Sequence, residues 1–206
     1  FAAGEDDGRD FYALRTTREF GAHGFGAMAT RVENPSVDRV ASVYEADHRW
    51  SNARWNVRST VVGSEVAQAG RTRRGDGAQV LVDHDIDGTW RQQLYALHIG
   101  ADFLLNDFGY LERNDFNYLR YDIARRRIGL PADSAYAAHD WHYAASHRSN
   151  NRGERIAWAA AVNRRSDRRD GGSEFFDIAV FSRGIDDLIT RGHGNVRVPG
   201  KAYAYF

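Results

Sequence analysis

The chain has 206 residues, which is enough for one domain with a substantial core. Its 28 basic and 28 acidic residues cancel, which argues against a dedicated nucleic-acid-binding protein, so we expect no nucleic-acid partner. Cysteine is absent, which excludes disulfides and thiolate chemistry.

Alternation of apolar and polar residues predicts β-strands along most of the chain. Residues 54–66 give the clearest case, because Trp55 and Val61 face one way while Arg54 and Arg58 face the other. The remaining predicted strands and hairpins are residues 11–17, 24–33, 39–50, 78–95, 117–127, 139–147, 155–164, 175–182 and 201–206. No helix of ordinary length is predicted, and no apolar run reaches the roughly 18 residues of a transmembrane helix.

Three polar stretches, residues 68–77, 167–172 and 184–200, are predicted to be loops. Residues 78–95 read as a hairpin around a three-residue loop, Ile86–Gly88, with Gly88 in the left-handed conformation. This register would place Asp83 opposite Arg91 as a cross-strand charge pair.

Residues 102–116 form a central connection between predicted strands. Its apolar residues at 104, 105, 108 and 111 have helical spacing, which indicates a turn or two of helix before Gly109 breaks it. We expect an ordered connection that packs its own apolar side chains. Ordered long loops are often functional, although a structural plug or cap over the end of a sheet fits the same pattern.

The candidate binding residues in this connection are Asp107, Glu112, Arg113 and Asp115. Paired carboxylates of this kind can perform acid–base hydrolysis. With 28 acidic residues in the chain such pairs also arise by chance, and a salt-bridged loop is the simpler interpretation. We therefore assign no catalytic residue.

Two patterns resemble metal sites. Asp83, Asp85 and Asp87 before Gly88 match the first half of a calcium loop, but Leu94 occupies the position of the bidentate glutamate, which favours turn chemistry. His139 and His142 point to opposite faces of a strand, so a shared metal is not expected. The sequence predicts no metal and no cofactor.

The fold class that these patterns predict is all-β, a long antiparallel meander of about ten or eleven strands. Long strands with apolar and polar faces are typical of an outer-membrane-type β-barrel. We expect residues 1–206 to be a single β-barrel-like domain, truncated at both ends. A β-sandwich, a propeller and a large ligand-binding barrel are the soluble alternatives.

Residues 106–115, 170–175 and 186–192 resemble a family of uncharacterised bacterial proteins. In that family an N-terminal carbohydrate-binding module, similar to family nine, precedes a C-terminal domain of unknown function with a predicted outer-membrane barrel. The resemblance covers the whole chain, within the C-terminal domain. It implies location in the bacterial outer membrane and a lipid bilayer as partner. Carbohydrate would be bound only through the module outside these residues.

The function expected from pattern and resemblance together is non-enzymatic. The chain would be an outer-membrane β-barrel segment with a role in envelope passage or surface attachment connected with glycan use. The alternatives are a β-rich carbohydrate-active hydrolase that uses loop carboxylates, and a soluble β-sheet binding module.

Overall fold

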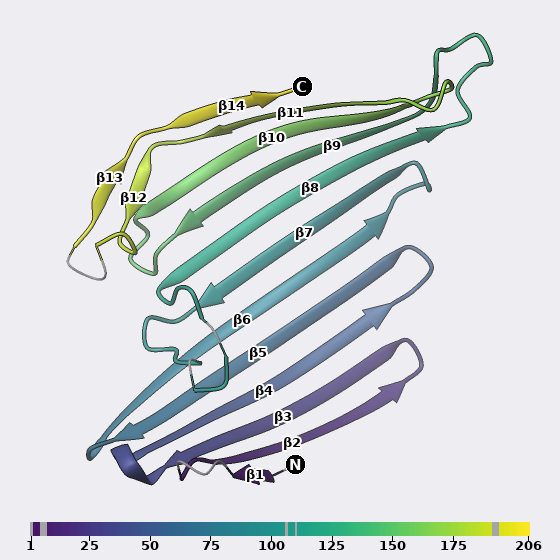
Figure 1. The fold of residues 1–206 in the computed structure, drawn as a ribbon. Helices are drawn as coiled ribbons and strands as arrows, with labels where there is room; N and C mark the ends of the chain where they lie inside the picture. The colour runs from purple at the N-terminus through teal and green to yellow at the C-terminus, as the bar shows by residue number, and fades with distance from the viewer. Residues whose placement is uncertain (1, 5–7, 106, 110, 191–193) are drawn as a thin grey trace. The chain divides into compact units, whose positions relative to one another are not determined.

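The computed structural model describes residues 2–4, 8–105, 107–109, 111–190 and 194–206, and it is almost entirely β (Figure 1). The only helical element among these residues is one 3-10 turn, Pro35–Val37. The strands are β1 (Ala2–Gly4), β2 (Asp10–Phe20), β3 (His23–Asn34), β4 (Arg39–Ser51), β5 (Trp55–Gln68), β6 (Arg71–Asp85), β7 (Trp90–Ile99), β8 (Phe116–Ile128), β9 (Tyr136–Ser149), β10 (Arg155–Arg168), β11 (Ser173–Phe181), β12 (Gly184–Asp186), β13 (Val196–Val198) and β14 (Lys201–Tyr205).

The sheet confirms the predicted all-β meander. Strands β1 to β11 are ordered as they occur in the sequence, and β14 follows β11. Strands β12 and β13 form a separate small antiparallel sheet. Among the described residues the order does not return from β14 to β1, so the sheet is not closed and the predicted barrel is not shown.

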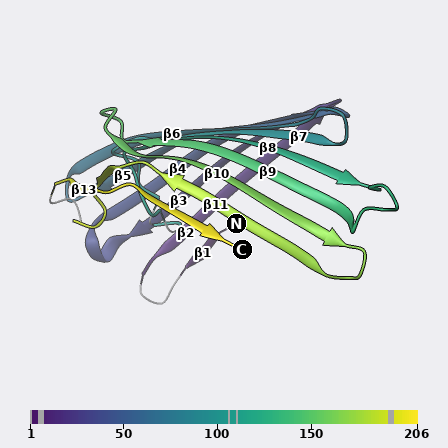
Figure 2. The same ribbon diagram turned by 90° about the horizontal axis from the view of Figure 1, so that it is seen from above.

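The chain divides into two compact units, each described below by itself. Unit 1 contains residues 1–81 and 97–117, and unit 2 contains residues 82–96 and 118–206. In unit 1, β2 to β5 pair antiparallel along their full length. In unit 2, β9, β10 and β11 pair antiparallel in succession and β14 pairs with residues 177–181 of β11, and Figure 2 shows these strands in order. Within the described part of the chain, no helix has the length and hydropathy needed to span a bilayer.

The loop predicted for residues 68–77 is wrong, because β6 already begins at Arg71. The turn consists of Ala69 and Gly70 alone, both with positive φ, of 48° and 74°. Two such residues in succession make the tight turn whose twist matches that of a hairpin. A polar, arginine-rich composition therefore marked a strand with exposed charges rather than a loop.

The β6–β7 hairpin has the predicted left-handed Gly88, with φ of 77°, but a different register. The carboxylate of Asp87 accepts hydrogen bonds from the backbone of Thr89 and Trp90, at 2.9 and 2.8 Å. This local turn places Arg91 next to Asp85, at 3.5 Å, and not opposite Asp83. The shift is by two residues, so every side chain keeps its predicted face.

Candidate functional site

One face of unit 1, which we call its apolar face, presents large apolar side chains to the outside. Paired residues in adjacent strands share a face, and the register places Leu14 with Ala29 and Tyr44. Leu14 is 72% exposed. The other large apolar side chains exposed on this face include Tyr12, Phe20, Phe25, Trp55 and Val61, and Arg18 and Arg31 are exposed on the same face. Along β5, every residue on this face from Trp55 to Gly63 is uncharged, a length of about 27 Å.

Aromatic rings gather at one end of the apolar face of unit 1. Phe25 lies edge-on to Phe20, with ring centroids 6.2 Å apart, and its ring is 4.8 Å from that of His48. His23 Nδ1 and His48 Nε2 are 3.0 Å apart, which joins β3 to β4. Trp50 borders the same group, 6.5 Å from His23. The apolar face thus ends in a row of amphipathic rings.

The opposite face of unit 1, its polar face, carries ion pairs that cross a strand. The carboxylate of Asp47 on β4 lies directly above Gly26 on β3 and reaches Arg15 on β2, at 3.0 Å. Arg49 makes a parallel crossing to Glu19, at 2.6 Å. A side chain on Gly26 would occupy the space that the Asp47 carboxylate fills. These pairs are exposed, so each contributes little stability alone.

The central connection packs against the polar face of unit 1, as Figure 1 shows where it crosses β6 and β5. Phe103 is only 2% exposed, and its backbone lies so close to Gly75 on β6 that any Cβ there would overlap it. The backbone N–H of Leu104 donates to Ser64 Oγ on β5, at 3.0 Å. The predicted turn or two of helix is not found among the described residues of the connection, where Leu105 O accepts hydrogen bonds from the backbone N–H of residues 108 and 109, at 2.9 and 3.1 Å.

Asp107, the first of the predicted binding residues, forms a two-pronged pair with Arg39 on β4. Arg39 Nε and Nη2 donate to the two carboxylate oxygens at 2.8 and 2.7 Å. Both side chains are three-quarters or more buried. The carboxylate of Asp107 therefore fastens the connection to the sheet, in the salt-bridged manner that the sequence favoured.

The other predicted binding residues do not converge with Asp107 on one site. Glu112 is exposed, whereas the guanidinium of Arg113 lies over the Phe116 ring, 5.7 Å from its centroid. Asp115 has a positive φ of 52° and donates its backbone N–H to Gly100 O, at 3.3 Å, which closes the connection. Asn106 and Tyr110 of the same motif lie outside the described residues.

The two metal-like patterns have local structural partners. Asp85 and Asp87 accept backbone hydrogen bonds from the turn that they precede, and Asp83 accepts from Gln93, at 2.6 Å. His139 contacts Ser166, whereas His142 contacts Asp122, at 2.9 and 2.8 Å. Among the described residues, no group of three or more His, Cys, Asp or Glu side chains could hold a metal ion.

Unit 2 also has an apolar face. The register of β9, β10 and β11 places Tyr143, Val162 and Ile178 in one row across this face. Tyr143 and Ile178 are exposed, as are Trp158 and Val180 on the neighbouring rows. The pattern of unit 1 is thus repeated on strands that the sequence places far away.

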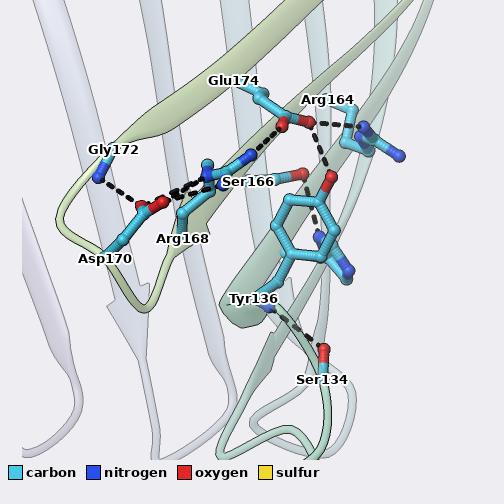
Figure 3. Close-up of polar contacts among 9 residues, drawn as sticks. Ser134, Tyr136, Arg164, Ser166, Arg168, Asp170, Gly172 and Glu174 are labelled. Atoms are coloured by element: carbon cyan, nitrogen blue, oxygen red, sulfur yellow. Dashed lines mark hydrogen bonds and ion pairs between the residues drawn. The ribbon is translucent and has the colours of Figure 1, made fainter.

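A polar cluster borders this apolar face at the turn between β10 and β11. Figure 3 shows the Tyr136 hydroxyl pointing at Glu174, to which it donates at 2.8 Å. Arg168 lies between Glu174 and Asp170, at 3.3 and 2.7 Å. The hydrogen bonds from Arg168, together with the backbone N–H of Gly172, lower the pKa of Asp170 to about 2. The cluster is charged at all ordinary pH values and fixes the turn.

The polar face of unit 2 carries a hydrogen-bonded row that runs from β8 to β10. Arg120 Nε and Nη2 donate to the Asp122 carboxylate, both at 2.7 Å, and Asp122 is 7% exposed. His142 Nε2 lies 2.8 Å from the same carboxylate. Asn163 Nδ2 lies 3.2 Å from His142 Nδ1, so a neutral imidazole protonated on Nε2 satisfies both contacts.

Beside this row the polar face of unit 2 is hollowed. The cavity has a volume of about 280 Å³ and a floor of small side chains from three strands, including Ala144, Ala161 and Ala179. Sequence reasoning missed this site. The available signal was alanine at the centres of consecutive predicted strands, which leaves space on a sheet.

Comparison with known proteins adds no relative, because no protein-family model and no curated protein matches this chain.

Proposed function

We propose that this chain is a non-enzymatic segment of an outer-membrane β-barrel. In this proposal the apolar faces of both units contact lipid, and the polar faces line the interior. Its role would be envelope passage or surface attachment connected with glycan use, as the resemblance to the bacterial family implies. The observation that carries the proposal is the contrast between the faces, because exposed Leu14 and Tyr44 alternate with the paired charges of Arg15 and Glu45.

Strand length supports the proposal. Strands β2 to β10 have 10 to 15 residues each, whereas crossing a bilayer takes about 9–11 residues in a tilted strand. Strands of soluble proteins usually have about 5–6 residues. The strands of this chain are thus long enough to cross a bilayer.

The border of the apolar face supports the proposal as well. Phe20, Phe25, Trp50 and His23 gather at one end of unit 1, where Trp50 pairs with Val57 near the start of the uncharged stretch of β5. Aromatic residues form girdles where an outer-membrane barrel meets the lipid headgroups, and Trp50 and His23 each carry a polar ring nitrogen. A soluble sheet would instead need a second layer over Leu14 and its neighbours.

The central connection gives the third argument. It packs on the polar face of unit 1, where Phe103 is buried and Asp107 pairs with Arg39. In a barrel this face would line the interior, so the connection would narrow or cap the passage. The carboxylate of Asp107 is engaged by arginine.

The first test follows the protein in bacterial envelopes. We expect it in the outer-membrane fraction, and we expect its mobility on a gel to change on boiling, because closed barrels resist unfolding by detergent at room temperature. A soluble protein with no heat-dependent shift would contradict the proposal and favour the soluble binding module.

A second test exploits the absence of cysteine from the chain. Single substitutions Tyr44→Cys and Glu45→Cys place thiols on neighbouring residues of opposite faces. After reconstitution in lipid vesicles, an environment-sensitive dye at position 44 should emit as in hydrocarbon and should be quenched by a lipid-soluble quencher. The dye at position 45 should respond only to a water-soluble quencher. Equal responses at both positions would overturn the assignment of the faces.

A further inference from the structure

The hollow on the polar face of unit 2 has the form of a binding trough. Its floor, named above, consists of alanines from β9, β10 and β11. Tyr118 on β8 and Arg148 on β9 line one side of the trough. Phe181 on β11 and Tyr203 on β14 line the other side. The volume of about 280 Å³ lies just below the range of about 300–1,000 Å³ for pockets that hold drug-sized ligands, so it suits a ligand of monosaccharide size.

Arg148 supplies a positive charge to the trough, and Asp177 supplies a negative one. The guanidinium of Arg148 lies 5.1 Å from the centroid of the Tyr118 ring, and among the described residues it has no carboxylate partner. Arg120, which also lines the trough, is neutralised by its two-pronged pair with Asp122. A guanidinium that lies over an aromatic ring and has no carboxylate partner among the described residues is suited to bind the carboxylate of a ligand.

The other polar groups suit hydroxyls. Tyr203 donates its hydroxyl hydrogen to Asp177, at 3.1 Å, which leaves the second carboxylate oxygen of Asp177 as an acceptor. Asn163 and His142 are oriented by their mutual contact and line the same trough. These groups are fixed before a ligand arrives, which lowers the entropic cost of binding.

The sides of the trough supply aromatic faces. Phe181 and Tyr203 stack with ring centroids 6.2 Å apart and an interplanar angle of 30°. Tyr118, whose ring lies under the Arg148 guanidinium, is on the opposite side. A pyranose ring has C–H groups that pack on such faces and hydroxyls around its edge that reach polar side chains. A planar anion without hydroxyls would not use the second carboxylate oxygen of Asp177, which can accept a hydrogen bond from a ligand hydroxyl.

We propose that the trough binds a sugar acid, a monosaccharide-sized ring with one carboxylate and several hydroxyls. Arg148 binds the carboxylate, whereas Asp177, Tyr203 and Asn163 bind hydroxyls. This inference does not depend on the barrel, because the trough lies on the opposite face of the sheet from Tyr143 and Ile178. Failure of the envelope tests would therefore leave it standing.

The test measures binding of three probes to the folded 206-residue chain in detergent micelles, by saturation-transfer NMR and calorimetry. Galacturonate carries both the carboxylate and the hydroxyls, galactose carries the hydroxyls alone, and acetate carries the carboxylate alone. We expect galacturonate to bind with a dissociation constant in the millimolar range or below, and each partial probe to bind at least about tenfold more weakly.

Two matched variants localise the effect. Arg148→Gln should weaken galacturonate binding about tenfold or more and leave galactose binding nearly unchanged. Arg127→Gln removes the same charge from an exposed position of β8 that does not line the trough, and should change neither. The inference is overturned if galacturonate does not bind the folded chain, if acetate binds equally well, or if both variants behave alike.

Discussion

In unit 1, the space above the glycines of the polar face is filled from within the chain. A carboxylate covers Gly26, and the backbone at Phe103 covers Gly75. In unit 2, the space above Ala144 and Ala161 stays open as a cavity of about 280 Å³. Small residues at strand centres therefore mark where a sheet has room. In unit 1 a neighbouring side chain or backbone segment occupies this space, whereas in unit 2 the space is left open and could hold a ligand.

The largest expected effect comes from Gly75→Ala. The added Cβ would overlap the backbone of the central connection, which cannot move aside as a flexible side chain can. We expect the free energy of unfolding to fall by about 2–3 kcal/mol, as for other overpacked sites. Urea titration followed by circular dichroism would measure it.

Gly63→Ala is the control for this substitution. Gly63 lies on neighbouring β5, and an added Cβ there would meet only Gly75 O, at 3.9 Å. We expect a change of less than about 0.5 kcal/mol. Equal effects of the two substitutions would mean that the connection does not rest on Gly75.

Asp107→Asn tests whether one ion pair holds the connection in place. The substitution keeps the shape of the side chain but removes the charge that Arg39 binds with two hydrogen bonds. Because both side chains are largely buried, we expect a loss of about 1.5 kcal/mol and faster proteolysis of the connection. The exposed pair of Asp102 and Arg73 serves as control, and Asp102→Asn should cost less than about 0.5 kcal/mol. Indistinguishable variants would show that apolar packing alone holds the connection.

Gly26→Ala should have a smaller effect. The atoms that the new Cβ would displace belong to the end of the Asp47 side chain, which can rotate away and give up its contact with Arg15. We expect a cost of about 0.5 kcal/mol, the value of an exposed ion pair. In a double-mutant cycle, Gly26→Ala should cost nothing further once Asp47 is replaced by Ala. A full cost in the Asp47→Ala background would contradict this account.

The strands could be predicted from the sequence because alternation is a local signal. The faces assigned to Trp55, Val61 and Arg58 are those that the register shows. The β6 loop was mispredicted because charge alone does not distinguish a loop from an exposed strand. In the connection, the Asp107–Arg39 pair joins residues 68 positions apart, and no local pattern reveals it. The trough depends on register between β9, β10 and β11, so it appears only when the strands are aligned.

Ala161→Leu should have the smallest effect on stability and the sharpest effect on binding. Ala161 lies at the centre of the trough floor, between Ala144 and Ala179 in the register, where the cavity leaves room for a larger side chain. We expect the free energy of unfolding to stay within about 0.5 kcal/mol of the original, whereas Gly75→Ala destabilises unit 1 with a single added carbon. Galacturonate binding should be lost, because the leucine side chain would occupy the space of the sugar ring. If a stable Ala161→Leu variant bound galacturonate as before, the cavity above Ala161 would not be the binding site.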